Sequence, residues 1–198
     1  MVPPSPTYRL RPATDDDKLD VLRWRNQPLV RAAMLTTGEI PLEGHLKWWE
    51  KQKTDPGYRL MIVERAGVPV AVKTYMNLDA PRSVWWGFYL TDQVPADSKE
   101  QLDIWAHVET AGILYPFDFL GVDAILCEVR KENTSVTFWH NRFGFQDIDP
   151  GVSPNTAEFA LDVKQLDRVR FEEKRAKGLY RREAEIAFVA HPRDTGGA

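Results

Sequence analysis

The chain has 198 residues, which is the usual length of one domain and enough to bury a substantial core. Its 43% hydrophobic and 28% charged residues are ordinary for a soluble globular protein, and the net charge of -3 argues against bulk binding to nucleic acid or to a membrane surface. Nothing at the N-terminus resembles a signal peptide and no apolar run approaches membrane-spanning length, so we expect a cytoplasmic protein. A single cysteine, Cys127, excludes an internal disulfide, and its apolar neighbours predict a buried thiol.

The first part of the chain is predicted to hold a strand and two main helices. Residues 1–7 are proline-rich, and we expect a disordered tail there. Polar and apolar residues alternate over residues 8–13, which predicts a strand. Three aspartates at 15–17 suit the start of a helix that Pro28 ends. A second helix is expected to begin near Pro41, with one inner face formed by Leu42, His45, Leu46 and Trp49.

A meander of three strands and a long helix are predicted next. The strands cover residues 58–65, 68–77 and 84–90, and Gly87 in the third strand favours a bulge or a close backbone approach. A polar segment then leads to Asp97 or Ser98, either of which suits the N-cap of a helix that runs to about residue 119.

The stretch from Ala124 to Phe145 is the most informative part of the sequence. Residues 124–129 are apolar and partly β-branched, which indicates an inner strand. Asn133 suits a turn and helix cap, and Val136, Trp139, His140 and Phe143 repeat at helical spacing. Gly144 is expected to end this helix.

The remaining residues are predicted to add a strand over residues 156–163 and a charged amphipathic helix over residues 166–177. The segment 181–189 fits either a helix or a strand. The order of elements predicts an α+β (α/β-like) fold with a mixed sheet and helices packed on it. We expect one domain over residues 8–163, followed by a C-terminal helical extension and tail over residues 164–198.

Three motifs, together with the order of elements, resemble the GNAT superfamily of N-acetyltransferases. They are Trp24-Arg25-Asn26 with Pro28 and Arg31, the helix that carries His45 and Trp48, and Glu128-Val129 with Asn133, His140 and Gly144-Phe145. The resemblance covers about residues 8–163. Within the superfamily the chain looks like the branch that acetylates nucleotide-linked amino sugars in pseudaminic acid biosynthesis. Ribosomal-protein N-terminal acetyltransferases share much of the pattern, so a protein N-terminus or another small amine is an alternative acceptor.

The resemblance implies a single-domain GNAT fold, in which a mostly antiparallel sheet is splayed between its central strands with helices on both faces. Acetyl-CoA would be the co-substrate, with no metal, and transfer to the amine would be direct, through a tetrahedral intermediate. The pantetheine arm would enter the gap between the central strands and bond the backbone of Phe88, Tyr89 and Leu90. Asn133 matches a family position that bonds this arm, and helix capping is its alternative role.

The resemblance also implies two catalytic residues. His140 occupies the place where many relatives carry a tyrosine that protonates the departing thiolate, and a histidine can donate a proton near neutral pH. A histidine packed between helix and sheet is the alternative. Glu128 can anchor a water that takes the proton of the amine, or it can be an outward-facing or salt-bridged residue.

The acceptor site, by resemblance, uses Arg25, Met34 and His45, with Trp48 nearby. Arginine can stack on a base or contact a diphosphate, and methionine adapts to a flat ring. Lys73 is a further candidate for a phosphate contact. The alternative is that Arg25 is an exposed helix residue and His45 lies at the edge of the core. We expect a small-molecule acceptor and no nucleic-acid or membrane partner, and the sequence is compatible with a homodimer.

The sequence departs from the family pattern after the third meander strand. Relatives carry a glycine-rich turn there, whose backbone N–H groups hold the pyrophosphate of coenzyme A. Residues 91–101 contain no glycine, and Asp92, Asp97 and Glu100 add negative charge. Only Ser98 and Lys99 favour a diphosphate. A GNAT-fold binding or regulatory protein without activity is therefore an alternative function.

Overall fold

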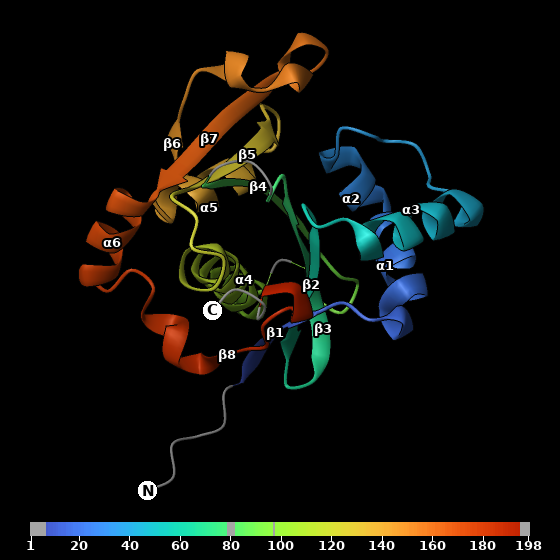
Figure 1. The fold of residues 1–198 in the computed structure, drawn as a ribbon, viewed down its shortest axis with the longest axis horizontal. Helices are drawn as coiled ribbons and strands as arrows, with labels where there is room; N and C mark the ends of the chain where they lie inside the picture. Colours follow the sequence, from blue (N-terminus) through green and yellow to red (C-terminus); the bar gives the residue numbers. More distant parts are fainter. Residues whose placement is uncertain (1–6, 79–81, 97, 195–198) are drawn as a thin grey trace, which may run out of the picture.

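The computed structural model describes residues 7–78, 82–96 and 98–194 (Figure 1). Those ranges contain six α-helices, which are α1 Lys18–Arg25, α2 Pro28–Ala33, α3 Leu42–Thr54, α4 Lys99–Asp118, α5 Thr134–Arg142 and α6 Arg168–Ala176. They also contain eight strands, which are β1 Tyr8–Pro12, β2 Arg59–Arg65, β3 Val68–Met76, β4 Ser83–Leu90, β5 Ala124–Arg130, β6 Gln146–Asp147, β7 Leu161–Asp167 and β8 Ile186–Phe188.

All eight strands join one sheet in the order β6-β7-β5-β4-β3-β2-β1-β8. Most neighbours are antiparallel, and β4 with β5 and β1 with β8 are parallel. The central pair β4 and β5 is bonded only between residues 83–85 and 124–126. Beyond Trp85 and Leu126 the two strands diverge while each keeps its other neighbour. The sheet is therefore splayed at its centre, as expected, and it confirms the predicted α+β fold.

Helices cover both faces of the sheet (Figure 1). The small helices α1 to α3 lie on one face, where Trp24 and Trp49 pack with Val21, Ile62 and Val72. The long helix α4 lies on the other face, beside α5 and α6, and forms the larger core with the strands. Phe117 of α4 stacks on Phe171 of α6 at 4.2 Å between ring centroids. Each face of the sheet is thereby buried by apolar side chains, which is the main stabilising term of such a domain.

Local sequence signals set the limits of the two helices that flank the splay. Ser98 is the N-cap of α4 and accepts a hydrogen bond from the backbone of Gln101 at 3.0 Å. Asn133 caps α5 in the same way, through the backbone N–H of Val136 at 3.3 Å. Gly144 follows α5 with φ of 103°, a conformation that glycine adopts without steric cost. Asp97, the other expected cap, lies outside the described residues.

One expectation about local structure differs from what is observed, and two open alternatives are resolved. The strand predicted over residues 156–163 is displaced, because β7 runs Leu161–Asp167 and Thr156 belongs to a short 3-10 helix. The segment 181–189 forms a 3-10 turn and then β8, which pairs in parallel with β1. Gly87 makes no bulge, because β3 and β4 pair regularly through Thr74 and Gly87. Residues past 163 thus complete the same sheet, by finishing β7 and adding β8 at its edge.

The described ranges contain no helix long and apolar enough to cross a membrane.

Candidate active site

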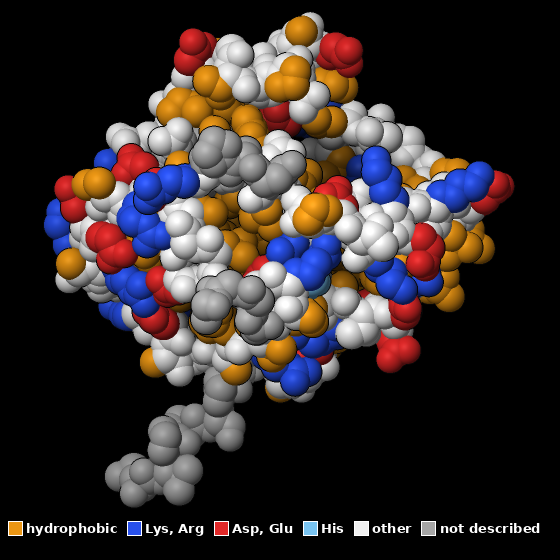
Figure 2. Space-filling view, viewed as in Figure 1, with side chains coloured by type: hydrophobic (Ala, Val, Ile, Leu, Met, Phe, Trp, Pro, Cys, Tyr) orange, Lys and Arg blue, Asp and Glu red, His pale blue; other side chains and the backbone are white. Residues whose placement is uncertain are grey.

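Two cavities meet where β4 and β5 diverge. The α3-side cavity, of about 350 Å³, is bounded by α1, α3 and the strands on their face of the sheet. The α5-side cavity, of about 480 Å³, is bounded by α2, the ends of β4 and β5, the start of α4, and α5. Figure 2 shows recessed hydrophobic side chains between α2 and the β5–β7 end of the sheet. Both cavities share a set of lining residues that includes Met34, Phe88, Tyr89, Glu128 and Arg130.

The splay leaves one edge of β4 without a strand partner. After Trp85 the described residues of β5 no longer pair with β4, so residues 86–90 face the cavities on that side. Phe88 and Tyr89 line both cavities and Leu90 lines the α5-side cavity. An unpaired strand edge can bond an extended ligand as an added strand would. The three residues expected to bond the pantetheine arm therefore lie together at one open edge.

Asn133 also lines the α5-side cavity, at the N-terminus of α5. Its side-chain oxygen accepts from the Val136 N–H, which confirms the capping role. Its amide nitrogen is a donor on the same side chain, so one residue can cap the helix and bond a ligand.

His140 lines the same cavity, and its ring is nearly completely buried against Trp86 and Phe145. Its Nδ1 lies 3.1 Å from Oε1 of Glu109, a fully buried carboxylate of α4. Burial opposes the charged imidazole, but the interactions of the ring with the side chains of Cys127 and Glu109 outweigh it and raise the pKa of His140 above its ordinary value. This direction favours the protonated ring, which is the form that a general acid needs.

Glu128 stands at the junction of the two cavities, on the opposite face of β5 from Cys127. Its carboxylate accepts hydrogen bonds from the Ser153 hydroxyl and from Nδ2 of Asn155, the latter at 3.0 Å to each oxygen. These two residues belong to the 3-10 turns before β7. They hold the carboxyl group in place beside both cavities, and no ion pair within the described residues involves Glu128.

The α1 motif holds the wall of the α3-side cavity. Trp24 is buried against the sheet, and Asn26 exchanges two 2.9 Å hydrogen bonds with the backbone of Ile40, which fixes the loop after α2. Arg25 reaches into the cavity, where its Nη2 donates to the carbonyl of Thr36 at 3.0 Å. Its buried Nη1 has no hydrogen-bond partner among the described residues. Burial lowers the pKa of Arg25, which marks a cation short of compensating contacts.

Three more of the expected acceptor residues line the α3-side cavity. Met34, His45 and Trp48 come from the loop after α2 and from α3. His45 is buried, its Nε2 lies 2.7 Å from the carbonyl of Lys18, and burial lowers its pKa, so it is a neutral ring that donates there. Its ring lies 5.3 Å from that of Trp48, and Tyr58 meets Trp48 edge-on. The site therefore presents aromatic surface next to Arg25.

Lys73 does not join these residues. Its side chain is completely buried on the α4 side of the sheet, and it lines neither cavity. The ammonium lies 3.4 Å from the ring centroid of Trp86, and burial lowers the pKa of Lys73 to about 7. This placement takes Lys73 away from any phosphate in the α3-side cavity.

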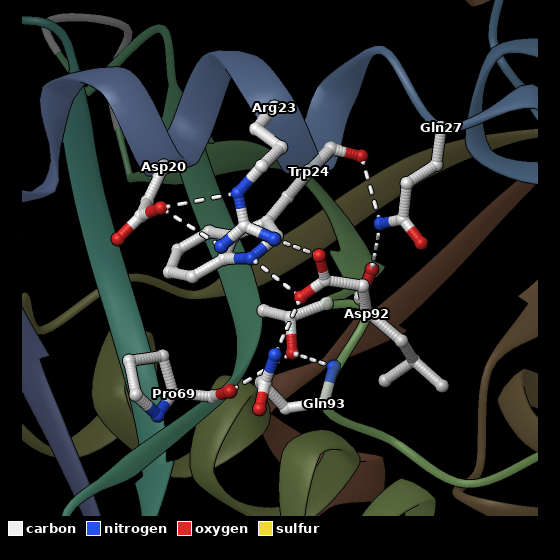
Figure 3. Close-up of polar contacts among 9 residues, drawn as sticks. Asp20, Arg23, Trp24, Gln27, Pro69, Asp92 and Gln93 are labelled. Carbon is white, nitrogen blue, oxygen red and sulfur yellow. Dashed lines mark hydrogen bonds and ion pairs between the residues drawn. The ribbon is translucent and has the colours of Figure 1, made fainter.

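The glycine-free loop after β4 is tied to α1 through Asp92 (Figure 3). The Asp92 carboxylate pairs with the Arg23 guanidinium and accepts a 3.0 Å hydrogen bond from Nε1 of Trp24. Farther on, Glu100 pairs with Arg65 of β2. Two of the three acidic residues expected to repel a diphosphate, Asp92 and Glu100, therefore have a cationic partner, and the third, Asp97, lies outside the described residues. Ser98 caps α4 and Lys99 is exposed in its first turn, although neither lines the α5-side cavity.

The chain was compared with known proteins. No family model matches it, and no curated protein matches it. Solved structures do match. An aminoglycoside acetyltransferase, solved with coenzyme A and kanamycin, has a TM-score of 0.71 at 13% identity, over 85% of this chain and 99% of that one.

Two further matches have the same architecture. Spermidine N-acetyltransferase from Vibrio cholerae, solved with CoA and spermine, has a TM-score of 0.69 at 14% identity, over 84% of this chain and 98% of that one. N-acetyltransferase PseH from Campylobacter jejuni, solved with acetyl coenzyme A, has a TM-score of 0.60 at 15% identity, over 81% of this chain and 99% of that one. The chain has the GNAT fold.

Within the GNAT fold, several residues of the candidate site were not identified from the sequence. Glu109 lies in an apolar helix and contacts His140 only through the packing of α4 on α5. Arg130 enters both cavities from the end of β5, one alternation after Glu128. That two-residue spacing on a strand was the one available signal. Ser153 and Asn155 gave none, because they reach Glu128 through a tertiary contact. Among the described residues no cluster suits a metal ion.

Proposed function

We propose that this protein is an acetyl-CoA-dependent N-acetyltransferase whose acceptor is a small primary amine that carries an anionic group. The α5-side cavity would hold the pantetheine arm along residues 86–90, with Asn133 bonding it. The α3-side cavity would hold the acceptor. The observation that carries the proposal is that the two cavities join at the splay, with His140 at one side of the junction and Glu128 within it.

The chemistry follows from this arrangement. The amine nitrogen would attack the thioester carbon directly, and a tetrahedral intermediate would collapse with loss of the CoA sulfur. An N–H of the open β4 edge would stabilise the oxyanion. Glu128, directly or through a water, would take the proton of the amine, and His140 would give a proton to the departing thiolate.

Charge in the α3-side cavity favours an acceptor of mixed charge. Arg25 and Arg130 line it, while Glu128 is its one acidic lining residue in the described part of the chain. A polyamine would face two guanidinium groups there, whereas an anionic acceptor would supply the missing partner of Arg25 Nη1. The aromatic rings of Trp48 and Tyr58 suit a base or a sugar. A nucleotide-linked amino sugar combines these features, and it is the acceptor we favour.

The discriminating experiment is a thiol-release assay with acetyl-CoA and three acceptor classes, which are nucleotide-linked amino sugars, polyamines and N-terminal peptides. We expect turnover with the first class. Turnover with peptides or polyamines alone would reject the acceptor assignment.

A binding or regulatory role without catalysis is the second candidate, and the glycine-free loop after β4 is the observation that favours it. Thermal-shift titration with acetyl-CoA separates the two roles. We expect stabilisation, and no shift at millimolar ligand would contradict the enzyme assignment.

A further inference from the structure

A buried carboxylate lies directly behind the proposed acid. Glu109, in the middle of α4, is 0% exposed, and its Oε1 is 3.1 Å from Nδ1 of His140. Its other oxygen, Oε2, has no hydrogen-bond partner in the described residues. An ionised carboxylate is costly to bury, and it is retained most readily when a cation shares its charge.

The ionisable groups around this pair come from every element packed against it. Lys73 projects from β3, Cys127 from β5 and Tyr180 from the segment after α6. The Cys127 thiol hydrogen-bonds to His140, whereas Lys73 and Tyr180 are near Glu109. The Tyr180 hydroxyl is already committed as a donor to the carbonyl of Phe143. Lys73 points its ammonium at the face of Trp86 and makes no hydrogen bond to Glu109. The Glu109 carboxyl group therefore lies near two basic side chains, Lys73 and His140, and forms a hydrogen bond only with His140.

The proton states follow from these contacts. Burial lowers the pKa of Lys73, whereas the contacts with Cys127 and Glu109 raise that of His140. Because Glu109 and His140 are both buried and lie 3.1 Å apart, an imidazolium beside the carboxylate is the arrangement in which each charge has a partner.

We propose that Glu109 is a positioning residue that keeps His140 as an imidazolium and turns its Nε2 toward the sulfur of the acyl donor. This inference rests on the proposed acetyl transfer. Glu109 touches neither substrate, because it lines neither cavity, and it acts through the ring that it holds. The arrangement is that of a carboxylate that orients a catalytic histidine and stabilises its charged form.

The step balances as follows. The amine nitrogen forms a bond to the acetyl carbon, the carbon–sulfur bond breaks, and its electron pair goes to the CoA sulfur. The proton of the amine leaves to Glu128, and the proton on Nε2 of His140 goes to the sulfur. Solvent then takes the first proton and replaces the second, so the products are amide and thiol. Throughout, Glu109 lowers the energy of the charged ring and fixes its direction.

The test uses Glu109→Gln, which keeps the size and the acceptor oxygen of the side chain but removes its charge. We expect kcat to fall at least tenfold, with KM for acetyl-CoA within about twofold. The high-pH limb of the kcat profile should move to lower pH, because the imidazole loses its proton earlier. Glu109→Asp should recover part of kcat and return the high-pH limb of the kcat profile toward its wild-type position.

The same helix offers a matched control. His107 of α4 lies 3.3 Å from the carboxylate of Glu185, and this second histidine–glutamate pair lines neither cavity. Glu185→Gln should leave kcat and its pH profile unchanged. A loss equal to that of Glu109→Gln would show a general structural effect and overturn the inference.

A readout that needs no turnover is the NMR titration of the His140 ring in the whole protein, assigned by its loss in His140→Gln. The wild-type ring should stay protonated through neutral pH, and in Glu109→Gln its pKa should fall toward the ordinary value of about 6.5. A neutral His140 ring at pH 7 in the wild type would overturn the inference, even if Glu109→Gln fails to fold. Absence of acetyl transfer by a wild type whose ring is charged would instead reject the proposed function and leave the pair intact.

Discussion

Asp92 and Arg23 form an ion pair that joins the loop after β4 to helix α1. Figure 3 shows the carboxylate of Asp92 beside both the Arg23 guanidinium and the indole of Trp24, and both side chains donate to it. The loop lacks the glycines expected at a diphosphate site. From the sequence alone, its acidic residues are expected to repel the diphosphate as well. The ion pair reduces this repulsion, because the negative charge of Asp92 is compensated by Arg23 of α1.

The first prediction concerns that compensation. Arg23→Ala would leave the Asp92 charge unpaired beside the α5-side cavity, so we expect acetyl-CoA to bind about threefold to tenfold more weakly. The double variant Arg23→Ala with Asp92→Asn should recover the wild-type affinity. Isothermal titration at low salt measures both. Asp20→Asn removes the other carboxylate partner of Arg23 without touching the loop and serves as the control. Equal affinity in all four proteins would mean that the pair has no part in cofactor binding.

His140→Phe tests the proposed acid. Phenylalanine keeps an aromatic ring at this position but removes the proton donor, so kcat should fall about a hundredfold or more. The dissociation constant for acetyl-CoA should change much less, because Phe fits the aromatic surroundings of Trp86 and Phe145. Stopped-flow thiol release and a separate binding titration distinguish the two effects. An unchanged kcat would remove His140 from the mechanism.

Arg25→Ala tests the charge of the acceptor. Hydrogen bonds to charged groups contribute about 1.5–3 kcal/mol, so KM for an anionic acceptor should rise about tenfold to a hundredfold. KM for acetyl-CoA should remain unchanged. Arg142→Ala is a matched control, since Arg142 is exposed and lines neither cavity. If KM for an uncharged amine rises as much as KM for an anionic one, Arg25 does not recognise the charge of the acceptor.

Lys73→Met tests the buried ammonium. Burial depresses the folded-state pKa of Lys73 to about 7, while an unfolded lysine titrates near 10.4. Between these values the unfolded chain binds more protons, so the wild-type free energy of unfolding should rise with pH relative to Lys73→Met. Urea unfolding of both proteins at pH 7 and pH 10 measures the difference. An equal difference in the free energy of unfolding at both pH values would mean that the pKa of Lys73 is not lowered in the folded protein.

Gly112→Ala tests the packing that encloses this lysine. A Cβ at Gly112 would lie 2.2 Å from Cε and Nζ of Lys73 and 2.6 Å from Cζ3 of Trp86. Overpacking of this kind costs about 1–3 kcal/mol, so the unfolding midpoint should drop. The double variant with Lys73→Ala should recover most of the loss. If Gly112→Ala is as stable as the wild type, α4 does not pack as closely on β3 as described.

The sequence by itself determined the elements that rest on local signals. Asn133, the apolar repeat of α5 and Gly144 fix a capped helix after a buried strand, because capping and periodicity act within a few residues. The motifs of the resemblance pointed to Arg25, His45, Trp48, Asn133, His140 and Glu128, and the fold brings these residues to two joined cavities.

Only the tertiary structure decided how charges meet. Glu109 and His140 are 31 residues apart and Arg23 and Asp92 are 69 apart, so neither pair has a local pattern. Whether Lys73 faces a ligand or the core depends on which face of β3 is covered by α4, and the strand pattern is buried on both sides. The limits of β7 likewise depend on its pairing with β5. Long-range contacts set the environment of each ionisable group, and the environment sets its charge and hence its chemistry.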